Sequence, residues 1–282
     1  MTKTKIAILG AGGKMGCRIS KNLKDDPSYE VAHIEISKDG ISRLNMMGFS
    51  VVLEEQAVPD ADVVILAVPD VLIGRITEKV VPTMKSGAML LGLDPAAAYA
   101  EVMPLREDLT YFVAHPSHPA IFNDEIDPIA QRDYFGGIAK QSAVCALYHG
   151  PESDYEKGEF LTRKIYAPVR KTYRITVEQM AILEPALVET FSSTLIAALK
   201  EGFDEIVQMG VPEEAAKDFF MGHARIQFAV LFGYADFTFS DGALLAMKEA
   251  RSHIFKEDWK NEIFDIEKIK QSVQNITNSI RK

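Results

Sequence analysis

The first 175 residues alternate between short apolar runs of strand length and segments with apolar residues at helical spacing. The opening reads as strand, glycine-rich turn, helix and strand, over residues 5–9, 10–16, 17–24 and 29–36. Apolar strands that alternate with helices indicate a parallel sheet covered on both faces. The pattern therefore predicts a doubly wound α/β domain over residues 1–175, with further strands at 51–53, 62–68, 88–92, 111–114, 142–148 and 171–176 and further helices at 71–81 and 155–166.

The pattern of apolar positions changes after residue 175, where strand-length runs give way to helical spacing throughout. Residues 178–209 keep helical spacing of apolar residues until Gly210 breaks the pattern, and Pro212 allows a new helix to begin. Helices are also predicted at 241–255 and 266–280, which makes residues 176–282 an all-helical C-terminal domain. The helix over 178–209 is too long and too apolar for a simple surface helix, so we expect it to be central. A helical domain of this size is not expected to bury that apolar excess by itself, so we expect a homodimer through residues 176–282.

Composition narrows the classes of partner. The chain has 282 residues and a net charge of −9 without a lysine or arginine block, which makes nucleic acid a poor partner. Neither an apolar run of 18 residues nor an apolar N-terminal leader is present, so we expect a cytoplasmic protein that does not bind a membrane. Cys17 and Cys145 lie in unrelated segments, and we expect both to be reduced core residues.

A glycine-rich segment lies where the first strand turns into the first helix. There, backbone without side chains can approach a pyrophosphate, and free N–H groups at the helix start can bind it. Glycines are also needed simply for turns, so the match alone is weak, and the last glycine is displaced from its usual place, which Met15 occupies. The preceding strand favours a nucleotide site made by Gly10, Ala11, Gly12, Gly13, Lys14, Met15 and Gly16.

Glu35 supports this Rossmann-type interpretation, because it ends the second strand 19 residues after Gly16. A carboxylate at this place accepts hydrogen bonds from the adenosine ribose and repels a 2′-phosphate, so we predict NAD as the cofactor. A second cofactor contact is expected at Val68 and Pro69, where a buried strand stops at the same edge of the sheet, although a plain strand end fits them almost as well.

Two histidines follow the strand at 111–114 on a proline-stiffened loop, His115-Pro-Ser-His118-Pro. Histidine suits general acid–base catalysis near neutral pH or metal ligation. A loop histidine is more often a bystander, but two beside the predicted nicotinamide make His115 and His118 the candidate catalytic residues.

The glycine segment, the Val68-Pro-Asp strand end and the His115-Pro loop resemble the 6-phosphogluconate, β-hydroxyacid and prephenate dehydrogenase superfamily. Residues 115–123, 136–141 and 176–186 are more closely similar to the D-apionate oxidoisomerases. That resemblance implies a small acidic polyhydroxy substrate, NAD-dependent oxidation at its C2 alcohol, and migration of a hydroxymethyl group from C3 to C2. The alternatives are a plain hydroxyacid or prephenate-type dehydrogenase and a non-catalytic NAD sensor; the paired histidines argue against the sensor.

A stretch of the helical half, residues 202–210 with Pro212, Glu213 and His223, resembles the ketol-acid reductoisomerases, whose helical domain supplies metal-binding carboxylates upstream. Glu184 falls within one residue of the first such carboxylate, but Ala186 or Leu187 occupies the place of the second. The resemblance therefore implies one divalent metal, zinc or magnesium, bound by His115 and Glu184, rather than two.

Two readings of these residues remain open. Glu184 precedes Pro185, and a charge at a restarting helix explains it equally well. In that case His115 would be the general base and His118 would orient the substrate carboxylate.

Overall fold

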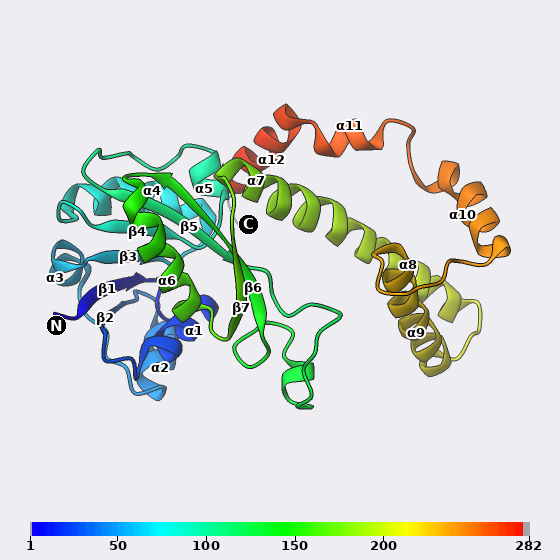
Figure 1. The fold of residues 1–282 in the computed structure, drawn as a ribbon, viewed down its shortest axis with the longest axis horizontal. Coiled ribbons are helices and arrows are strands. Elements are labelled where there is room, and N and C mark those ends of the chain that lie inside the picture. The colour runs from blue at the N-terminus through cyan, green and yellow to red at the C-terminus, as the bar shows by residue number, and fades with distance from the viewer. Residues whose placement is uncertain (1, 279–282) are drawn as a thin grey trace. The chain divides into compact units, whose positions relative to one another are not determined.

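The computed structural model describes residues 2–278 and is built on one seven-stranded sheet (Figure 1). The strand order is β2-β1-β3-β4-β5-β6-β7. All neighbouring strands pair in parallel except β5 and β6, which are antiparallel. The strands are β1 Thr4–Leu9, β2 Tyr29–Ile34, β3 Val63–Leu66, β4 Met89–Gly92, β5 Thr110–Pro116, β6 Gln141–His149 and β7 Val169–Arg174.

The antiparallel step departs from the parallel sheet expected from sequence. No crossover helix separates β5 from β6, so the chain leaves and re-enters the sheet at the same edge. The strand expected at 51–53 is reduced to an isolated bridge between Val51 and His33, because Leu53 already begins a short helix, α3 Glu54–Ala57. Helix α2, Lys38–Met46, was not expected, since its residues are mostly polar.

Alternate residues of β1 point to two different hydrophobic layers, which explains why both faces of the sheet are covered. Ile6 and Ile8 pack with the face that holds α1 and α6, whereas Ala7 and Leu9 pack with the opposite face. The helices that cover the sheet are α1 Lys14–Leu23, α4 Asp70–Val80, α5 Ala96–Tyr99, α6 Tyr155–Ile165 and α7 Val177–Ala181.

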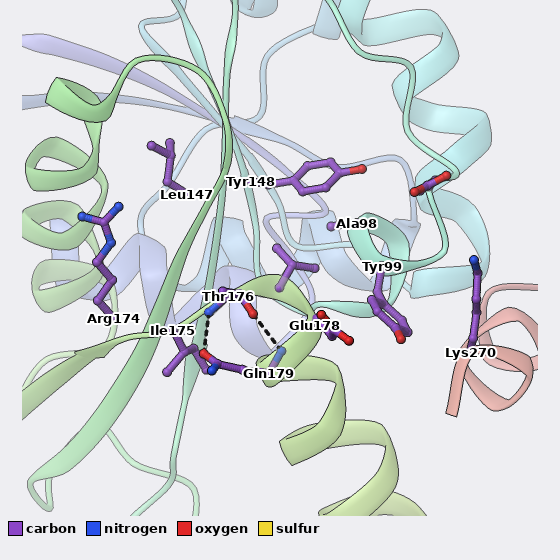
Figure 2. A pocket seen from close by; sticks show the side chains of 12 residues that line it. Ala98, Tyr99, Leu147, Tyr148, Arg174, Ile175, Thr176, Glu178, Gln179 and Lys270 are labelled. Carbon is purple, nitrogen blue, oxygen red and sulfur yellow. Dashed lines mark hydrogen bonds between the residues drawn. The ribbon is translucent and has the colours of Figure 1, made fainter. Parts of the chain in front are cut away.

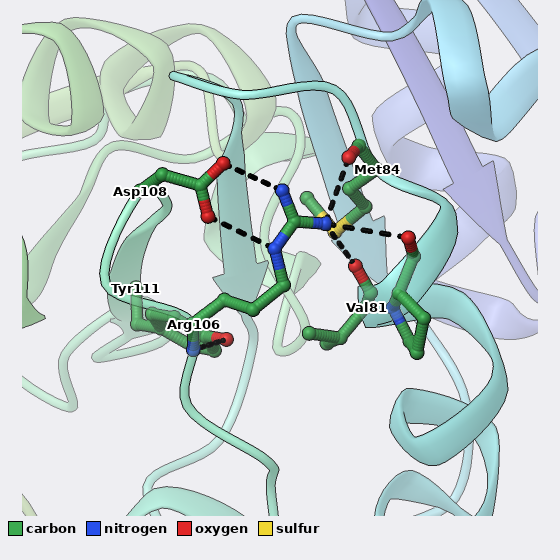
Figure 3. Close-up of polar contacts among 6 residues, drawn as sticks. Val81, Met84, Arg106, Asp108 and Tyr111 are labelled. Carbon is green, nitrogen blue, oxygen red and sulfur yellow. Dashed lines mark hydrogen bonds and ion pairs between the residues drawn. The ribbon is translucent and has the colours of Figure 1, made fainter.

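Arg106 fastens the start of β5 to the turn that follows α4 (Figure 3). Its Nη1 donates to the carbonyls of Val81 and Met84, at 2.7 and 2.9 Å, while Nε and Nη2 donate to the Asp108 carboxylate. The side chain thus satisfies carbonyl groups that the end of the helix leaves open.

The chain divides into two compact units, one formed by residues up to Glu184 and from Lys270 onward, the other by Pro185–Ile269. The sequence pattern had placed the boundary at 175/176. Helix α7 belongs with the sheet because Val177 and Met180 are buried in its core, and the last helix returns to the first unit with Val273 buried. Residues 279 and 280 of the helix expected at 266–280 lie outside the described residues.

The second unit consists of helices and contains almost no apolar core of its own. The helix expected at 178–209 runs over Val177–Gln208, with a π-helical segment Ile182–Ser192 around Pro185, which lacks an N–H donor. In place of the expected burial, α8, α10 and α11 contain no buried residue and α9 contains only Ala216. These helices are α8 Ser193–Gln208, α9 Glu213–Leu231, α10 Asp241–Ile254 and α11 Trp259–Phe264, and α12 Ile266–Asn278 follows them.

His33 in β2 is a buried titratable group that no catalytic argument uses. It is 7% exposed, its ring centroid lies 4.5 Å from that of Phe49, and its Nε2 has no hydrogen-bond partner within residues 2–278. Burial lowers the pKa of His33 to about 4, because the charged imidazolium would lose its hydration.

We expect this histidine to make the fold sensitive to acid. The unfolded chain binds a proton at His33 below its ordinary pKa of 6.5, whereas the folded chain does so only near pH 4, so the stabilisation is complete above pH 6.5 and is lost as the pH falls to 4. Denaturant titrations measure the free energy of unfolding at each pH. Between pH 6.5 and pH 4 that free energy should fall by about 3 kcal/mol less in His33→Leu than in the parent. The exposed control His253→Gln should follow the parent; parallel curves for His33→Leu and the parent would contradict the assignment.

Candidate active site

The glycine segment forms a tight turn from β1 into α1. Gly10 has a φ of +74°, and a Cβ at that position would lie 2.4 Å from the Ala67 carbonyl oxygen. A Cβ at Gly16 would lie 2.4 Å from the Gly10 oxygen, so the displaced glycine lets the first helical turn pack against the turn before it. The shifted spacing is thus a structural requirement of this turn.

The N-terminus of α1 is suited to bind an anion. Gly13 is the N-cap residue and makes no side-chain capping bond, and the first N–H groups of a helix have no partner within the helix. Lys14 and Met15 begin the helix, while Ala11 is fully buried and fixes the turn. A pyrophosphate is the ligand that this geometry fits.

Glu35 lies beside the glycine turn, one residue beyond β2. Its Oε2 accepts the Gly12 N–H at 2.9 Å, and its Oε1 accepts the N–H groups of Ile36 and Ser37 at 2.9 and 2.8 Å. Burial opposes ionisation of Glu35, but these backbone donors outweigh it and lower the pKa of the carboxyl below its ordinary value. The carboxylate is therefore charged at neutral pH.

The carboxyl ends of β3, β4 and β5 bring the other candidates to the same edge of the sheet. Val68 and Pro69 follow β3, and Pro69 is the N-cap of α4; a Cβ on Gly10 would lie 2.9 Å from Val68 Cγ1. The β3 end thus lies beside the glycine turn, and the contact of Val68 and Pro69 with the cofactor stays a prediction.

Three side chains with donor atoms for a metal meet at this edge: Asp94, His115 and Glu184. Their ligand atoms all lie within 4.8 Å of one another. His115 Nε2 is 3.7 Å from Glu184 Oε1 and 3.9 Å from Asp94 Oδ2. Glu184 is the last residue of the first unit, so the cluster is contained within that unit.

The tautomer of His115 follows from its surroundings. Its Nδ1 lies 2.9 Å from the Pro116 carbonyl oxygen, which can only accept, so Nδ1 carries the proton and Nε2 presents a lone pair to the two carboxylates. Burial lowers the pKa of His115 to about 4, so this ring is neutral at physiological pH. A lone pair facing two carboxylates is electrostatically unfavourable unless a cation lies among them or one carboxyl group is protonated.

The two carboxylates are held differently. Asp94 Oδ1 accepts the Ala96 N–H at 2.7 Å, which fixes its orientation at the start of α5. Burial raises the pKa of Glu184, and the nearby Asp70 raises it further, while His118 lowers it. Negative charge gathered in a partly dry place is typical of a metal centre.

His118 adjoins the cluster on the loop after β5. Its ring centroid lies 6.4 Å from that of His115, and its Nδ1 lies 2.8 Å from the Phe135 carbonyl oxygen. The same reasoning puts the proton on Nδ1 and leaves Nε2 as a proton acceptor. With a φ of +55°, His118 adopts a left-handed conformation that a non-glycine residue rarely takes, which is typical of functional sites.

Sequence reasoning missed Asp94. Asp94 is not part of a hydrophobic repeat that would draw attention to it, but it lies two positions after the buried strand β4. Residues just beyond strand ends face the ligand edge of such a sheet, and the argument that selected Val68 and His115 applies equally to Asp94.

A separate cavity of about 670 Å³ opens beside α5 and α7 (Figure 2). Tyr99, Tyr148 and Lys270 line it, together with Glu178 and Gln179. None of the predicted site residues lines it, so this cavity is distinct from the candidate active site.

Two families match successive parts of the chain. Residues 1–120 match the acetohydroxy acid isomeroreductase NADPH-binding domain, and residues 123–277 match the C-terminal domain of decarboxylating phosphogluconate dehydrogenase. Both agree with the superfamily inferred from the glycine turn and the histidine loop.

Individual relatives match the whole chain. D-apionate oxidoisomerase from Cupriavidus necator is 49% identical over 98% of this chain and all of its own length, and that from Rhizobium rhizogenes is 47% identical over 97% of this chain and all of its own. A solved structure from Cupriavidus necator, described as a semialdehyde dehydrogenase NAD-binding protein in complex with calcium and NAD, is 48% identical. It has a TM-score of 0.94 and covers 98% of this chain and 100% of that chain. The protein is thus an NAD-dependent oxidoreductase, and the chain belongs to the D-apionate oxidoisomerase family.

Proposed function

We propose that this protein oxidises D-apionate with NAD and rearranges the product to 3-oxo-isoapionate. The observation that supports the rearrangement is the Asp94–His115–Glu184 cluster, because three electron-rich ligand atoms lie within 4.8 Å at the edge that carries the glycine turn. Oxidation alone needs a base and a hydride acceptor, whereas a ketol shift also needs electrophilic help at the ketone.

The proposed chemistry has two balanced steps. In the first, the C2 hydroxyl loses its proton to a base and the C2 hydrogen leaves as hydride, which gives a C2 ketone; bound NAD⁺ supplies the hydride acceptor. In the second, the C3 hydroxyl loses its proton, the hydroxymethyl group moves with its bonding electrons from C3 to C2, C3 becomes the ketone, and the C2 oxygen takes up a proton.

We assign the proton transfers to His118 and metal ligation to His115. His115 has its Nδ1 beside the Pro116 carbonyl and its Nε2 near two carboxylates, which supports a ligand role. His118 has its Nδ1 beside the Phe135 carbonyl and its ring beside the cluster, which supports the role of general base. The glycine turn binds the pyrophosphate, and Glu35 orients the ribose.

The donor set favours one divalent metal. Three protein donors leave open positions for substrate, as in catalytic zinc sites, and the imidazole nitrogen favours zinc. The two carboxylate oxygens also suit magnesium and calcium. The Cupriavidus structure is described with calcium, so calcium belongs among the metals to be tested. When bound, the cation would polarise the ketone and stabilise the alkoxide through which the carbon skeleton rearranges.

We further propose that the protein is a homodimer through Pro185–Ile269. A mainly helical unit of 85 residues with almost no buried side chain cannot offset the loss of chain entropy, so another surface must cover it. A second copy provides an equally apolar surface. Large side chains left exposed in this unit include Ile196, Leu199, Met209, Phe219, Leu231 and Phe232.

The cofactor assignment predicts that NAD binds at least tenfold more tightly than NADP, a margin of about 1.4 kcal/mol or more. Glu35→Gln keeps a hydrogen-bond acceptor for the backbone but removes the charge that repels a 2′-phosphate, so the ratio of the two dissociation constants should narrow. Fluorescence titration measures both constants. The control Glu30→Gln, at an exposed position of β2, should leave the ratio unchanged; equal affinity of the parent for both cofactors would refute the role of Glu35.

The rearrangement predicts that product identity depends on the metal. Enzyme stripped with a chelator should regain 3-oxo-isoapionate formation, identified by ¹³C NMR, when zinc, magnesium, manganese or calcium is returned singly, with zinc the most effective. Asp94→Asn should weaken metal binding by at least about 10²-fold, because losing a direct ligand should cost no less than losing a residue that only supports a ligand.

The exposed control Asp25→Asn should bind metal as the parent does. Full rearrangement by enzyme shown to be metal-free would rule out the metal. Formation of NADH together with an unrearranged 2-oxo acid, even with metal present, would establish the plain dehydrogenase instead.

The dimer predicts that an exposed side chain behaves as a buried one. Ile196 is 57% exposed in the single chain, where substitution of a surface residue changes stability by about 0.5 kcal/mol or less. Ile196→Glu should nevertheless dissociate the protein, and light scattering at micromolar concentration should change from twice the chain mass to the chain mass. The charge reversal Lys217→Glu on α9 is the control. A monomeric parent would contradict the proposal. A parent that is soluble only in detergent would also contradict it, and this outcome is worth testing because the helix Val177–Gln208 is long and apolar enough to cross a membrane.

A further inference from the structure

Arg18 lies in α1, the helix whose N-terminus forms the nucleotide site, and its guanidinium is directed into the protein. The side chain is 8% exposed, although arginine in an amphipathic helix usually faces solvent. Its two terminal nitrogens donate to two different carbonyl groups, those of Phe135 at 3.1 Å and Tyr166 at 3.0 Å. We propose that Arg18 is a positioning residue that holds both site histidines from the cofactor helix. The catalytic part of this inference rests on the proposed function of His115 and His118.

The first of the two contacts, from Arg18 Nη1 to the Phe135 carbonyl, leads to His118. The Phe135 carbonyl oxygen that accepts from Arg18 Nη1 also lies 2.8 Å from His118 Nδ1. A carbonyl oxygen has two lone pairs, so both donors are accommodated, and the cationic one fixes the direction in which the carbonyl points. That direction sets the tautomer of His118 and the aim of its Nε2. Its strained backbone, with a φ of +55°, persists only where the surroundings hold it.

The second arm leads to His115. Tyr166 accepts from Arg18 Nη2 through its carbonyl, and its hydroxyl donates to the carbonyl of Ala114 at 2.9 Å. Ala114 directly precedes His115 in β5. Tyr166 is fully buried, which raises the pKa of its phenol well above the ordinary value and keeps the hydroxyl a donor at physiological pH. The guanidinium is thus connected to His118 through Phe135, and to His115 through Tyr166 and then Ala114.

The surroundings of the guanidinium are shaped to admit it. Gly136 has a φ of +95°, and a Cβ there would lie 3.0 Å from both terminal nitrogens of Arg18 and 2.9 Å from Gln141 Oε1. Gln141 is itself buried and donates to the same Tyr166 carbonyl at 2.8 Å. A side chain at position 136 would therefore displace the fork, and the glycine is required here by contact as well as by conformation.

A second residue of α1 contacts the same loop. Lys14 Nζ lies 3.7 Å from the centroid of the Phe135 ring, and Lys14 is the first residue of the helix. Phe135 is thus held by α1 through its ring and through its carbonyl. Because the same helix begins at the nucleotide site, the cofactor site and the two histidines share one rigid support.

The test separates the two arms. Arg18→Met removes both, and Arg18→Lys keeps the charge but reaches only one carbonyl. Tyr166→Phe removes only the donor to Ala114. Ring ¹⁵N NMR of histidine-labelled enzyme, with His118→Asn to assign the signal, reports the tautomer directly, and zinc competition with a chelating dye reports the His115 site.

We expect Arg18→Met to mix the His118 tautomers and to lower kcat by about 10²-fold, as a misplaced catalytic group does. The NAD dissociation constant should stay close to that of the parent, because the guanidinium binds Phe135 and Tyr166 rather than the glycine turn. Tyr166→Phe should weaken zinc binding and leave the His118 signal as in the parent. Arg18→Lys should give values of the tautomer ratio, zinc affinity and kcat between those of Arg18→Met and the parent. The control Arg163→Met, which removes a half-exposed pair with Glu159, should change none of these readouts.

A purely structural Arg18 would lower the melting temperature of Arg18→Met and leave tautomer, zinc affinity and kcat of the folded protein at parental values, and that result overturns the proposal. If Arg18→Met does not fold, Tyr166→Phe and Arg18→Lys decide on the same readouts. A different result would separate the two proposals. If His118→Asn retains full activity, but the His118 ring signal differs between the parent and Arg18→Met, the positioning role of Arg18 stands and the proposed function of His118 fails.

Discussion

Parallel pairing of β1, β3, β4 and β5 is the constraint on which the candidate site depends. In parallel pairs, strands run the same way, so each of these four strands ends at one edge of the sheet. This pairing explains why four features meet at one edge: the glycine turn, Val68, Asp94 and His115. Nearly one hundred residues of chain separate the glycine turn from His115. Ligand binding at this edge is the general rule for open α/β sheets.

Glu184 reaches the same edge by a different route. It lies not on a strand but at the start of the π-helical segment that contains Pro185. The absence of an N–H at Pro185 interrupts the ordinary helical ladder there, and hydroxyl groups satisfy carbonyls further along, with Thr190 Oγ1 donating to Pro185 at 2.7 Å. The local departure from α-helical geometry therefore coincides with the residue that completes the cluster.

Sequence reasoning was most successful where one physical rule links sequence to position. Strand alternation and strand ends located the glycine turn, Glu35 and His115, and those elements lie where they were expected. Arg18 escaped notice because an arginine on an amphipathic helix resembles a solvated residue, and its partners Phe135 and Tyr166 are 117 and 148 positions away. Burial of the helix 178–209 was expected from its apolarity, but apolarity alone does not say whether the same chain covers a surface.

Glu35 has a consequence for how such an enzyme can evolve. Its carboxylate accepts three backbone N–H groups, from Gly12, Ile36 and Ser37, and so it closes the loop in addition to its proposed role at the adenosine ribose. A lineage that replaced it with a small or basic residue would strand those three donors at the moment it removed the negative charge. Drift toward a phosphorylated cofactor is therefore opposed by the architecture of the turn itself, and it requires compensating substitutions in the loop to arise together with the change in charge.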